Sequence, residues 1–287
     1  MKVLNHKGIL IPVGGNEDKG ANEDYGTDFI EEGILAHVVR EGGGADASIV
    51  VFPTASSIPY EVGENYTDAF GRLGCSNIEV VHVQSREDAY EDAILESVKN
   101  ADIVMFSGGD QSRITEYIRG TALHKLLFDR LANDAKFVLA GTSAGAMMMS
   151  QEMIAGGSAT EAMIKGNVKM REGMGFVPEF IIDSHFVRRG RFGRMAEALA
   201  IFPHLMGIGL AEDTGLIIRG GQEFQVIGAG MVLLFDASGL THNNQKILKE
   251  GSAMSLSNLK THILVNGDCF NFEDKKIQVL PIHEQYI

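Results

Sequence analysis

The sequence predicts an α/β protein with a doubly wound, mostly parallel sheet flanked by helices and a C-terminal antiparallel β elaboration. Three observations predict this fold class. The sequence contains five short apolar, β-branched runs, typical of buried parallel strands, and four of them end at glycine or serine. Segments with helical spacing of apolar residues lie between them. After about residue 207, glycine-rich turns separate short β runs, which indicates hairpins or a meander.

The elements follow one another in a regular order. The expected strands are residues 8–15, 47–56, 77–83, 101–109 and 136–141. The expected helices are residues 27–41, 59–74, 86–100 and 119–134. This alternation implies right-handed crossovers in one sheet, so the carboxyl ends of the strands share one rim, where ligands bind. The glycines at 14–15, 108–109 and 141 mark that rim.

The last part of the chain continues the β pattern. Residues 243–257 are polar and predict a loop, and residues 261–282 predict a closing hairpin. No repeat or low-complexity linker divides the sequence. We therefore expect residues 1–287 to form one domain, with a core over about 8–235 and a C-terminal β extension over about 236–287.

Composition limits the classes of partner. The formal net charge of −13 and the pI near 5.1 disfavour binding to nucleic acid or to an anionic membrane, and favour a cationic substrate. Cys75 and Cys269 are far apart in sequence, so they predict neither a disulfide framework nor a zinc site. The first apolar run is too short for a signal peptide or a membrane span, so we expect a cytoplasmic protein.

One strand-to-helix turn carries a candidate nucleophile. Residues 141–145 read GTSAG and fit G-x-S-x-G, in which small neighbours allow a strained turn that exposes the serine oxygen. The turn follows a predicted buried strand and opens the helix-compatible run AGAMMMSQEM. The alternative is a plain tight turn in which Ser143 caps the following helix.

A serine hydroxyl needs a base, and the base needs an orienting acid. His185 is the best candidate base, because it follows a third apolar strand-like run in the polar block DSHFVRRGRFGR. Glu212 and Asp213 end another short strand, and they point to opposite faces if the segment is extended, so only one can reach the histidine. We prefer Glu212, although a charged hairpin turn would also explain the pair.

The oxyanion of an acyl-transfer site needs hydrogen-bond donors. Exposed backbone N–H groups are expected at Gly109 and Asp110, which precede a helix, and at Ala144, directly after the nucleophile. Asp110 also fits a plain helix cap.

Charged clusters suggest substrate contacts. A positive island is formed by Arg188, Arg189, Arg191 and Arg194. It could bind a substrate carboxylate, or it could be the solvated start of a helix. Acidic residues of the first loop could meet a guanidinium, or form a solvated loop: Glu17, Asp18, Glu23, Asp24, Asp28, Glu31 and Glu32.

Five blocks in this order, GGNEDK, GGDQ, GTSAGA, DSHFVRRGRFGRM and GIGLAEDT, resemble the cyanophycinase family. These enzymes are serine-type exopeptidases of the peptidase E clan with a class I glutamine amidotransferase-like fold. The resemblance covers most of residues 8–235. It implies that Ser143 is the nucleophile, His185 the base and Glu212 the acid. It also implies a substrate site lined by five residues, Gln111, Asp183, Arg189, Arg191 and Arg194.

The resemblance further implies a substrate. The family cleaves cyanophycin, a poly-aspartate whose β-carboxyls carry arginine, and releases β-Asp-Arg dipeptides without a metal or organic cofactor. One position departs from the family: Ser184 stands where glutamine usually precedes the histidine. Loss of that long amide would loosen substrate contacts or shift specificity. Proteins of this kind often dimerise, so a homodimer through the C-terminal β segment is an expectation.

Three alternatives remain at this point. An aspartyl or isoaspartyl dipeptidase of the same clan would keep the triad and change the pocket. A non-catalytic binding protein would keep the turn without its reactivity. A nucleotide-binding protein is disfavoured, since the chain has no G-x-x-x-x-G-K-[ST] motif and Gly14-Gly15 leads into acids.

Overall fold

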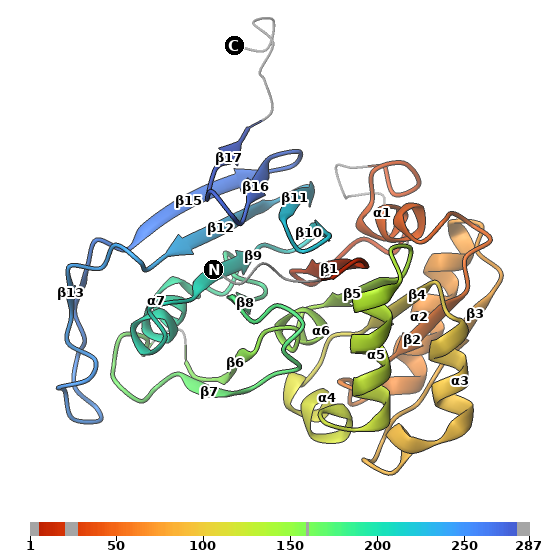
Figure 1. Ribbon diagram of the computed structural model, residues 1–287, viewed down its shortest axis with the longest axis horizontal. Helices are drawn as coiled ribbons and strands as arrows, with labels where there is room; N and C mark the ends of the chain where they lie inside the picture. Colours follow the sequence, from red (N-terminus) through yellow and green to blue (C-terminus); the bar gives the residue numbers. More distant parts are fainter. Residues whose placement is uncertain (1–5, 21–27, 159–160, 280–287) are drawn as a thin grey trace, which may run out of the picture.

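A computed structural model describes residues 6–20, 28–158 and 161–279 (Figure 1). Its larger sheet begins with the five predicted strands: β1 (Ile9–Val13), β2 (Ile49–Phe52), β3 (Ile78–Val80), β4 (Ile103–Phe106) and β5 (Val138–Thr142). They pair in parallel in the order β1-β5-β4-β2-β3. The predicted parallel sheet is confirmed, with strands shorter than the apolar runs that predicted them.

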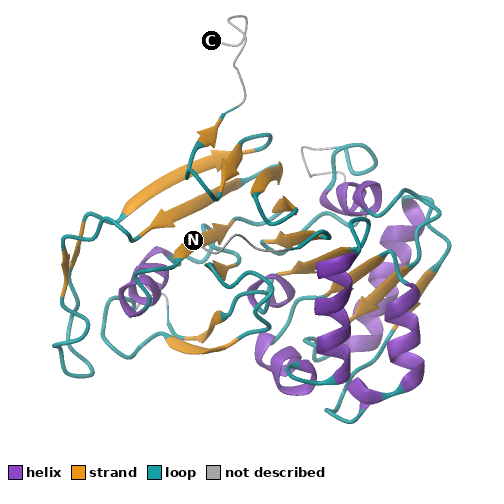
Figure 2. Ribbon diagram, viewed as in Figure 1, coloured by secondary structure: helices purple, strands orange, loops and turns teal. Residues whose placement is uncertain are grey.

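Helices cover both faces of this parallel half (Figure 2). The helices are α1 (Ile34–Glu41), α2 (Pro59–Arg72), α3 (Asp92–Asn100), α4 (Gln111–Ile118), α5 (Ala122–Asn133), α6 (Ala144–Met147) and α7 (Phe192–Ile201), with a short 3-10 turn at Asp88–Tyr90. Alternate residues of a strand point to opposite faces. Val50 therefore joins the core beneath α3, α4 and α5, whereas Ile49 and Val51 pack toward α1 and α2.

The second half of the larger sheet is antiparallel. Four strands extend it beyond β1: β10 (Thr214–Arg219), β11 (Glu223–Gly228), β16 (Cys269–Asn271) and β17 (Ile277–Gln278). A second sheet contains β8 (Phe180–Asp183), β9 (Met206–Leu210), β12 (Met231–Asp236) and β15 (Lys260–Val265), in the order β15-β12-β9-β8. Only β8 and β9 of that sheet run parallel. The expected α/β fold with an antiparallel β elaboration is thus confirmed.

The C-terminal segment differs in detail from the expected closing hairpin. Its first two strands belong to different sheets, because β15 pairs with β12 and β16 pairs with β11, and the hairpin that does form is the short one of β16 and β17. The turn between β15 and β16 is anchored to β11: Val226 N donates to Asp268 O, and Gly267 N donates to Val226 O, each at 2.9 Å. Residues 280–282 of the expected hairpin lie outside the described residues. The division of the chain near residue 236 stays a prediction.

Three other segments differ from expectation. The helix expected over residues 27–41 begins only at Ile34, and residue 27 lies outside the described ranges. The helix expected after the GTSAG turn is the single turn α6, and the chain then forms a hairpin of β6 (Glu152–Gly156) and β7 (Lys169–Glu172). The polar loop at 243–257 is closed by two short strands, β13 (His242–Asn243) and β14 (Leu256–Ser257).

Neither a membrane span nor a metal site is found in the described part of the chain. None of its helices is both long and apolar enough to cross a bilayer. Over the same residues, no three His, Cys, Asp or Glu side chains are grouped closely enough to hold a metal ion.

Candidate active site

Ser143 stands at a strained turn between β5 and α6. Its φ of 51° and ψ of −107° lie outside the regions that non-glycine residues ordinarily adopt. Glycines on either side allow the close packing: a Cβ on Gly141 would lie 2.3 Å from Gly145 O, and one on Gly145 would lie 2.4 Å from Phe106 O. The Ser143 side chain makes no capping hydrogen bond to α6. The plain-cap alternative is therefore wrong, and the hydroxyl is available.

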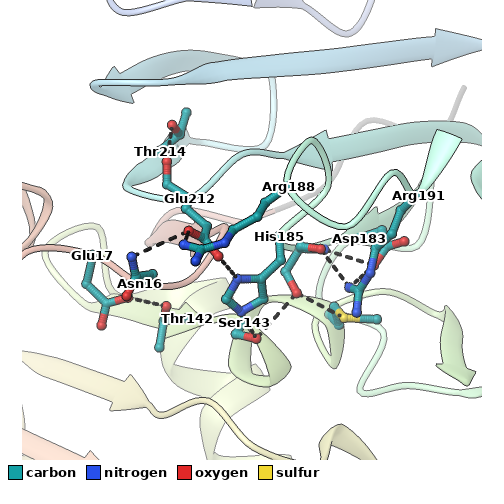
Figure 3. A network of polar contacts seen from close by, with 12 residues as sticks. Asn16, Glu17, Thr142, Ser143, Asp183, His185, Arg188, Arg191, Glu212 and Thr214 are labelled. Atoms are coloured by element: carbon teal, nitrogen blue, oxygen red, sulfur yellow. Dashed lines mark hydrogen bonds and ion pairs between the residues drawn. The ribbon is translucent and has the colours of Figure 1, made fainter. Parts of the chain in front are cut away.

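His185 and Glu212 meet because β8 and β9 are parallel neighbours. Each residue stands two positions after the last residue of its strand, so both side chains leave the same end of the sheet. His185 Nε2 lies 3.0 Å from Ser143 Oγ, and His185 Nδ1 lies 2.7 Å from Glu212 Oε1 (Figure 3). Like Ser143, His185 has a positive φ, 47°. The three side chains form one continuous hydrogen-bonded chain.

The backbone after β1 holds the histidine in place. His185 N donates to Gly14 O at 2.8 Å. Gly15 has a φ of +99°, and a Cβ there would lie 2.5 Å from His185 Nε2. The GG dipeptide of the first block therefore supports the imidazole directly, a role that the sequence pattern did not reveal.

Glu212, and not Asp213, contacts the histidine. Its second oxygen accepts hydrogen bonds from Arg188 Nη1 at 2.7 Å and from Asn16 Nδ2 at 3.4 Å. Asp213 is buried with a φ of 47°, and its Oδ1 accepts from Asp18 N at 3.2 Å. Asn16 was not among the expected site residues, and Arg188 was expected only as a member of the arginine island that could bind a substrate carboxylate. Arg188 carried a signal, since it belongs to the dense arginine block.

The surroundings set the protonation of this chain of side chains. Burial lowers the pKa of His185, and the nearby Arg189 and Arg191 charges add to that effect against the opposing hydrogen bond with Glu212. Burial alone would raise the pKa of Glu212, but hydrogen bonds from Arg188 and His185 bring it below its usual value. Near neutral pH, a neutral imidazole therefore lies between the serine and an ionised carboxylate. That is the state in which a histidine can accept the serine proton.

The expected oxyanion donors need one correction. Asp110 N donates to Ala55 O at 2.9 Å, and the Asp110 carboxylate accepts from Ser112 N at 2.8 Å and caps α4. The predicted helix cap at Asp110 is present, and the backbone amide of Asp110 is already paired with Ala55 O. Gly109 instead borders the same cavity as Ser143, and Gly108 faces the serine so closely that a Cβ would lie 3.3 Å from Ser143 Cβ.

The N–H groups of Gly108, Gly109 and Ala144 have no hydrogen-bond acceptor within the described residues. For Gly109 and Ala144 the role of oxyanion donor stays a prediction, and Gly108 is a further candidate because it packs beside the serine.

Asp183, Arg191 and Arg194 form a buried ionic cluster. Asp183 is 0% exposed, and its carboxylate accepts from Arg191 Nη1 at 2.8 Å, from Arg194 Nε at 2.9 Å and from Arg194 Nη2 at 2.5 Å. Arg191 Nη1 also donates to Ser184 O at 2.6 Å. The carboxylate is enclosed by two guanidinium groups, and none of the three residues borders the cavity at Ser143, so the cluster does not line an open substrate surface as expected. The three charged groups fix the backbone that carries His185.

The other expected substrate residues have different environments. Arg189 is exposed and borders the cavity beside Ser143. Gln111 Nε2 donates to Ile154 O at 2.9 Å, which ties α4 to β6. Ser184 is buried, and its Oγ lies 3.4 Å from Ser143 Oγ and 3.3 Å from Met147 Sδ. The structure therefore brings Ser184 to the nucleophile and leaves Arg189 as the arginine open to a ligand.

The cavity at Ser143 has a volume of about 440 Å³, within the usual range for small-molecule sites. It is bordered by Ser143, His185, Gly108, Gly109, Arg189 and Glu17, among others. Glu17 is buried and accepts from Thr142 Oγ1 and Tyr66 Oη at 2.5 Å and from Lys19 Nζ at 2.8 Å. These partners lower its pKa although burial opposes ionisation.

The acidic first loop is therefore only partly solvated. Glu17 and Asp18 are buried, whereas Glu31 and Glu32 are exposed. Glu23 and Asp24 lie outside the described residues. A negative charge thus borders the cavity, but from one buried carboxylate rather than from the whole loop.

Comparison with known proteins identifies the family. A model described as Peptidase family S51 matches residues 26–226. A cyanophycinase of Thermosynechococcus vestitus is 32% identical over 279 residues, covering 96% of this chain and 84% of that protein. A cyanophycinase of Geminocystis herdmanii is 33% identical over 271 residues, covering 94% of this chain and 96% of that protein.

Solved structures show the same fold. A peptidase from an acI-B1 actinobacterium aligns with a TM-score of 0.64 at 23% identity, over 94% of this chain and 98% of that one. A putative peptidase E from Listeria monocytogenes aligns with a TM-score of 0.50 at 15% identity, over 78% of this chain and 99% of that one. From the matched family and relatives, the chain belongs to peptidase family S51 and is a serine-type peptidase.

Proposed function

We propose that this peptidase is an exopeptidase that hydrolyses cyanophycin to β-Asp-Arg dipeptides through a Ser143–His185–Glu212 triad and an acyl-enzyme. The observation that carries the proposal is the hydrogen-bonded chain of these side chains, at 3.0 and 2.7 Å, beside a cavity. Relatives named cyanophycinases, matched over nearly the whole chain, support the choice of substrate.

The chemistry follows from the geometry. Ser143 Oγ attacks the carbonyl carbon of the scissile Asp–Asp bond while His185 Nε2 takes the hydroxyl proton. Amides near Gly108, Gly109 and Ala144 stabilise the oxyanion. When the intermediate collapses, His185 returns its proton to the leaving amine. Water then attacks the acyl-enzyme with His185 as base, which releases the acid and restores the serine.

Charge near the cavity suits this polymer. Each repeat carries a guanidinium and the free α-carboxylate of the arginine unit. Arg189 offers a cation at the cavity edge that suits the free carboxylate of the repeat. The ionised Glu17 lies in the cavity wall, where Lys19 already pairs with it.

The test is mass spectrometry of the soluble products after incubation with purified cyanophycin. We expect β-Asp-Arg from the unmodified protein, and a decrease of about 10⁶-fold in kcat for Ser143→Ala. The matched control is Ser97→Ala on α3, whose hydroxyl bonds only to Glu79 and to its own helix, and it should leave the rate unchanged.

A fluorophosphonate label separates the remaining outcomes. If Ser143 is labelled but no dipeptide is released, the serine is reactive and the substrate is another aspartyl or isoaspartyl peptide. If neither dipeptide nor label is found, the proposed triad chemistry is wrong.

A further inference from the structure

A second cavity, of about 280 Å³, lies on the same rim of the larger sheet as the active site. Its walls come from the segments that follow β2 and β3, from the first residue of α2 and from α4. Among the residues that border it are Thr54, Ser56, His82, Arg113 and Tyr117. None of these residues borders the cavity at Ser143, so the two cavities are separate.

Two polar atoms of this second cavity's residues lack a partner. Thr54 is 7% exposed, and neither its buried Oγ1 nor the buried Nδ1 of His82 has a hydrogen bond within the described part of the chain. Buried polar groups nearly always have hydrogen-bond partners, and leaving such a group without a hydrogen bond costs about 1–3 kcal/mol. Neither atom is accessible to a water-sized group in the cavity, so the donors that can face a ligand come from the other polar groups of its wall.

The chemistry of the walls selects an anion. Arg113 donates one N–H to Ser56 O at 2.9 Å, and its other donors remain for a ligand. Hydroxyl groups, the imidazole of His82 and the amide of Gln84 add further donors. Among the residues that the structure describes, no Asp or Glu borders the cavity, although the chain has a net charge of −13. A planar carboxylate fits an arginine supported by hydroxyl donors.

The cavity is close enough to the active site to serve the same substrate. Ala55, between Thr54 and Ser56, accepts a hydrogen bond from Asp110 N, directly after the glycines that face Ser143. Helix α2 borders both cavities, with Pro59 at the second cavity and Val62 and Tyr66 at the first. At 1.5 Å per helical residue, Pro59 and Tyr66 lie about 10 Å apart along the axis. An extended peptide spans that distance with about three residues.

We infer that this second cavity is a substrate subsite, which binds a carboxylate of the peptide chain about three residues from the scissile bond. The inference rests on the proposed function, because a polymer with a free carboxylate in every repeat supplies that group at regular intervals. Such a subsite makes hydrolysis of long chains more efficient than hydrolysis of short ones.

The first experiment tests the site without catalysis. Succinate is titrated into the full-length protein while the imidazole Cε1–H signals are followed by NMR, with the His82 signal assigned from its absence in His82→Phe. We expect a saturable change at His82 whose affinity falls about tenfold or more in Arg113→Gln. Gln84→Glu, at an exposed position on the cavity edge, should also weaken binding. Arg171→Gln, on exposed β7, is the matched control and should bind normally.

The second experiment tests use of the site by substrate. We compare kcat/KM for oligomers of one to four β-Asp-Arg units beyond the scissile bond. We expect a rise of about tenfold once the chain reaches the second cavity. Arg113→Gln should reduce kcat/KM for the long oligomer about tenfold more than for the shortest one, and Arg171→Gln should change neither.

The outcomes separate this inference from the proposed function. No saturable change at His82, or an equal loss for short and long oligomers in Arg113→Gln, would overturn the subsite. If succinate shifts only the imidazole signal of His185, the subsite is also overturned, because the anion then binds at Arg189. If no oligomer is cleaved while succinate binds with dependence on Arg113, the proposed function fails and the carboxylate site stands.

Discussion

Two carboxylates at adjacent strand ends have opposite environments. Glu212, after β9, contacts His185 beside the cavity, and 19% of its side chain is exposed. Asp183, the last residue of β8, is completely buried between Arg191 and Arg194. Both are carboxylates paired with cationic or titratable partners within 3 Å. The difference in burial therefore separates Glu212, whose charge can take part in catalysis, from Asp183, whose charge holds the backbone in place.

This difference explains how one dense block serves two purposes. His185 follows Asp183 by two residues, and its unusual positive φ is kept because the surrounding backbone is over-determined. The buried arginines hold the Asp183 carboxylate and the Ser184 carbonyl, which fixes the chain on the N-terminal side of the histidine. Hydrogen bonds from His185 N to Gly14 O and from Phe186 N to Leu210 O fix the other side.

Of the two carboxylates, the one that contacts His185 should have the larger effect on catalysis. Glu212→Gln should reduce kcat about 10⁴-fold, because an amide can hold the wrong histidine tautomer and cannot stabilise the imidazolium. The measurement is kcat on cyanophycin. Asp213→Asn is the matched control and should lose less than tenfold, since its side chain bonds to Asp18 N. A greater loss in Asp213→Asn would mean that Asp213 orients the base.

The buried carboxylate should affect stability rather than chemistry. Asp183→Asn leaves two arginine charges without their partner, and we expect the free energy of unfolding to fall by about 3–5 kcal/mol. Urea denaturation measures this. Glu212→Gln, whose carboxylate is partly solvated, should change the free energy of unfolding by less than about 1 kcal/mol.

The comparison would break if Asp183→Asn kept full stability and lost activity. That result would mean that Asp183 contacts substrate, as the family resemblance first implied.

The smallest expected effect is a shift in pH dependence. The positive charge of Arg189 lowers the pKa of His185, so Arg189→Gln should raise it. The base is active only when neutral, which requires a pH above its pKa. The acidic limb of kcat/KM should therefore move to higher pH.

Two variants control this shift. Arg189→Lys keeps the charge and should keep the position of the limb, and Arg171→Gln should leave it unchanged. If the acidic limb of kcat/KM moves as far in Arg189→Lys as in Arg189→Gln, the shape of the Arg189 side chain, and not its charge, sets the pKa of His185.

Local patterns in the sequence were enough for the parallel half of the fold and for the nucleophile turn. Residues 138–145 combine an apolar strand with two glycines around a serine, and close backbone packing leaves few other arrangements for such a segment. The path of residues 261–279 was not predictable in the same way. Whether β15 and β16 pair with each other or with β12 and β11 depends on residues 24 or more positions away in sequence.

By itself, the sequence determined which residue types were available at the rim: a serine on a strained turn, a histidine after one strand and two acids after another. Only the tertiary structure decided which of them meet. The parallel pairing of β8 and β9 brings Glu212 to His185. The side chains of Asp183, Arg191 and Arg194 pair with one another away from solvent instead of facing the cavity. Distance and solvent exposure depend on contacts between segments far apart in the chain, and residue spacing alone carries no information on either.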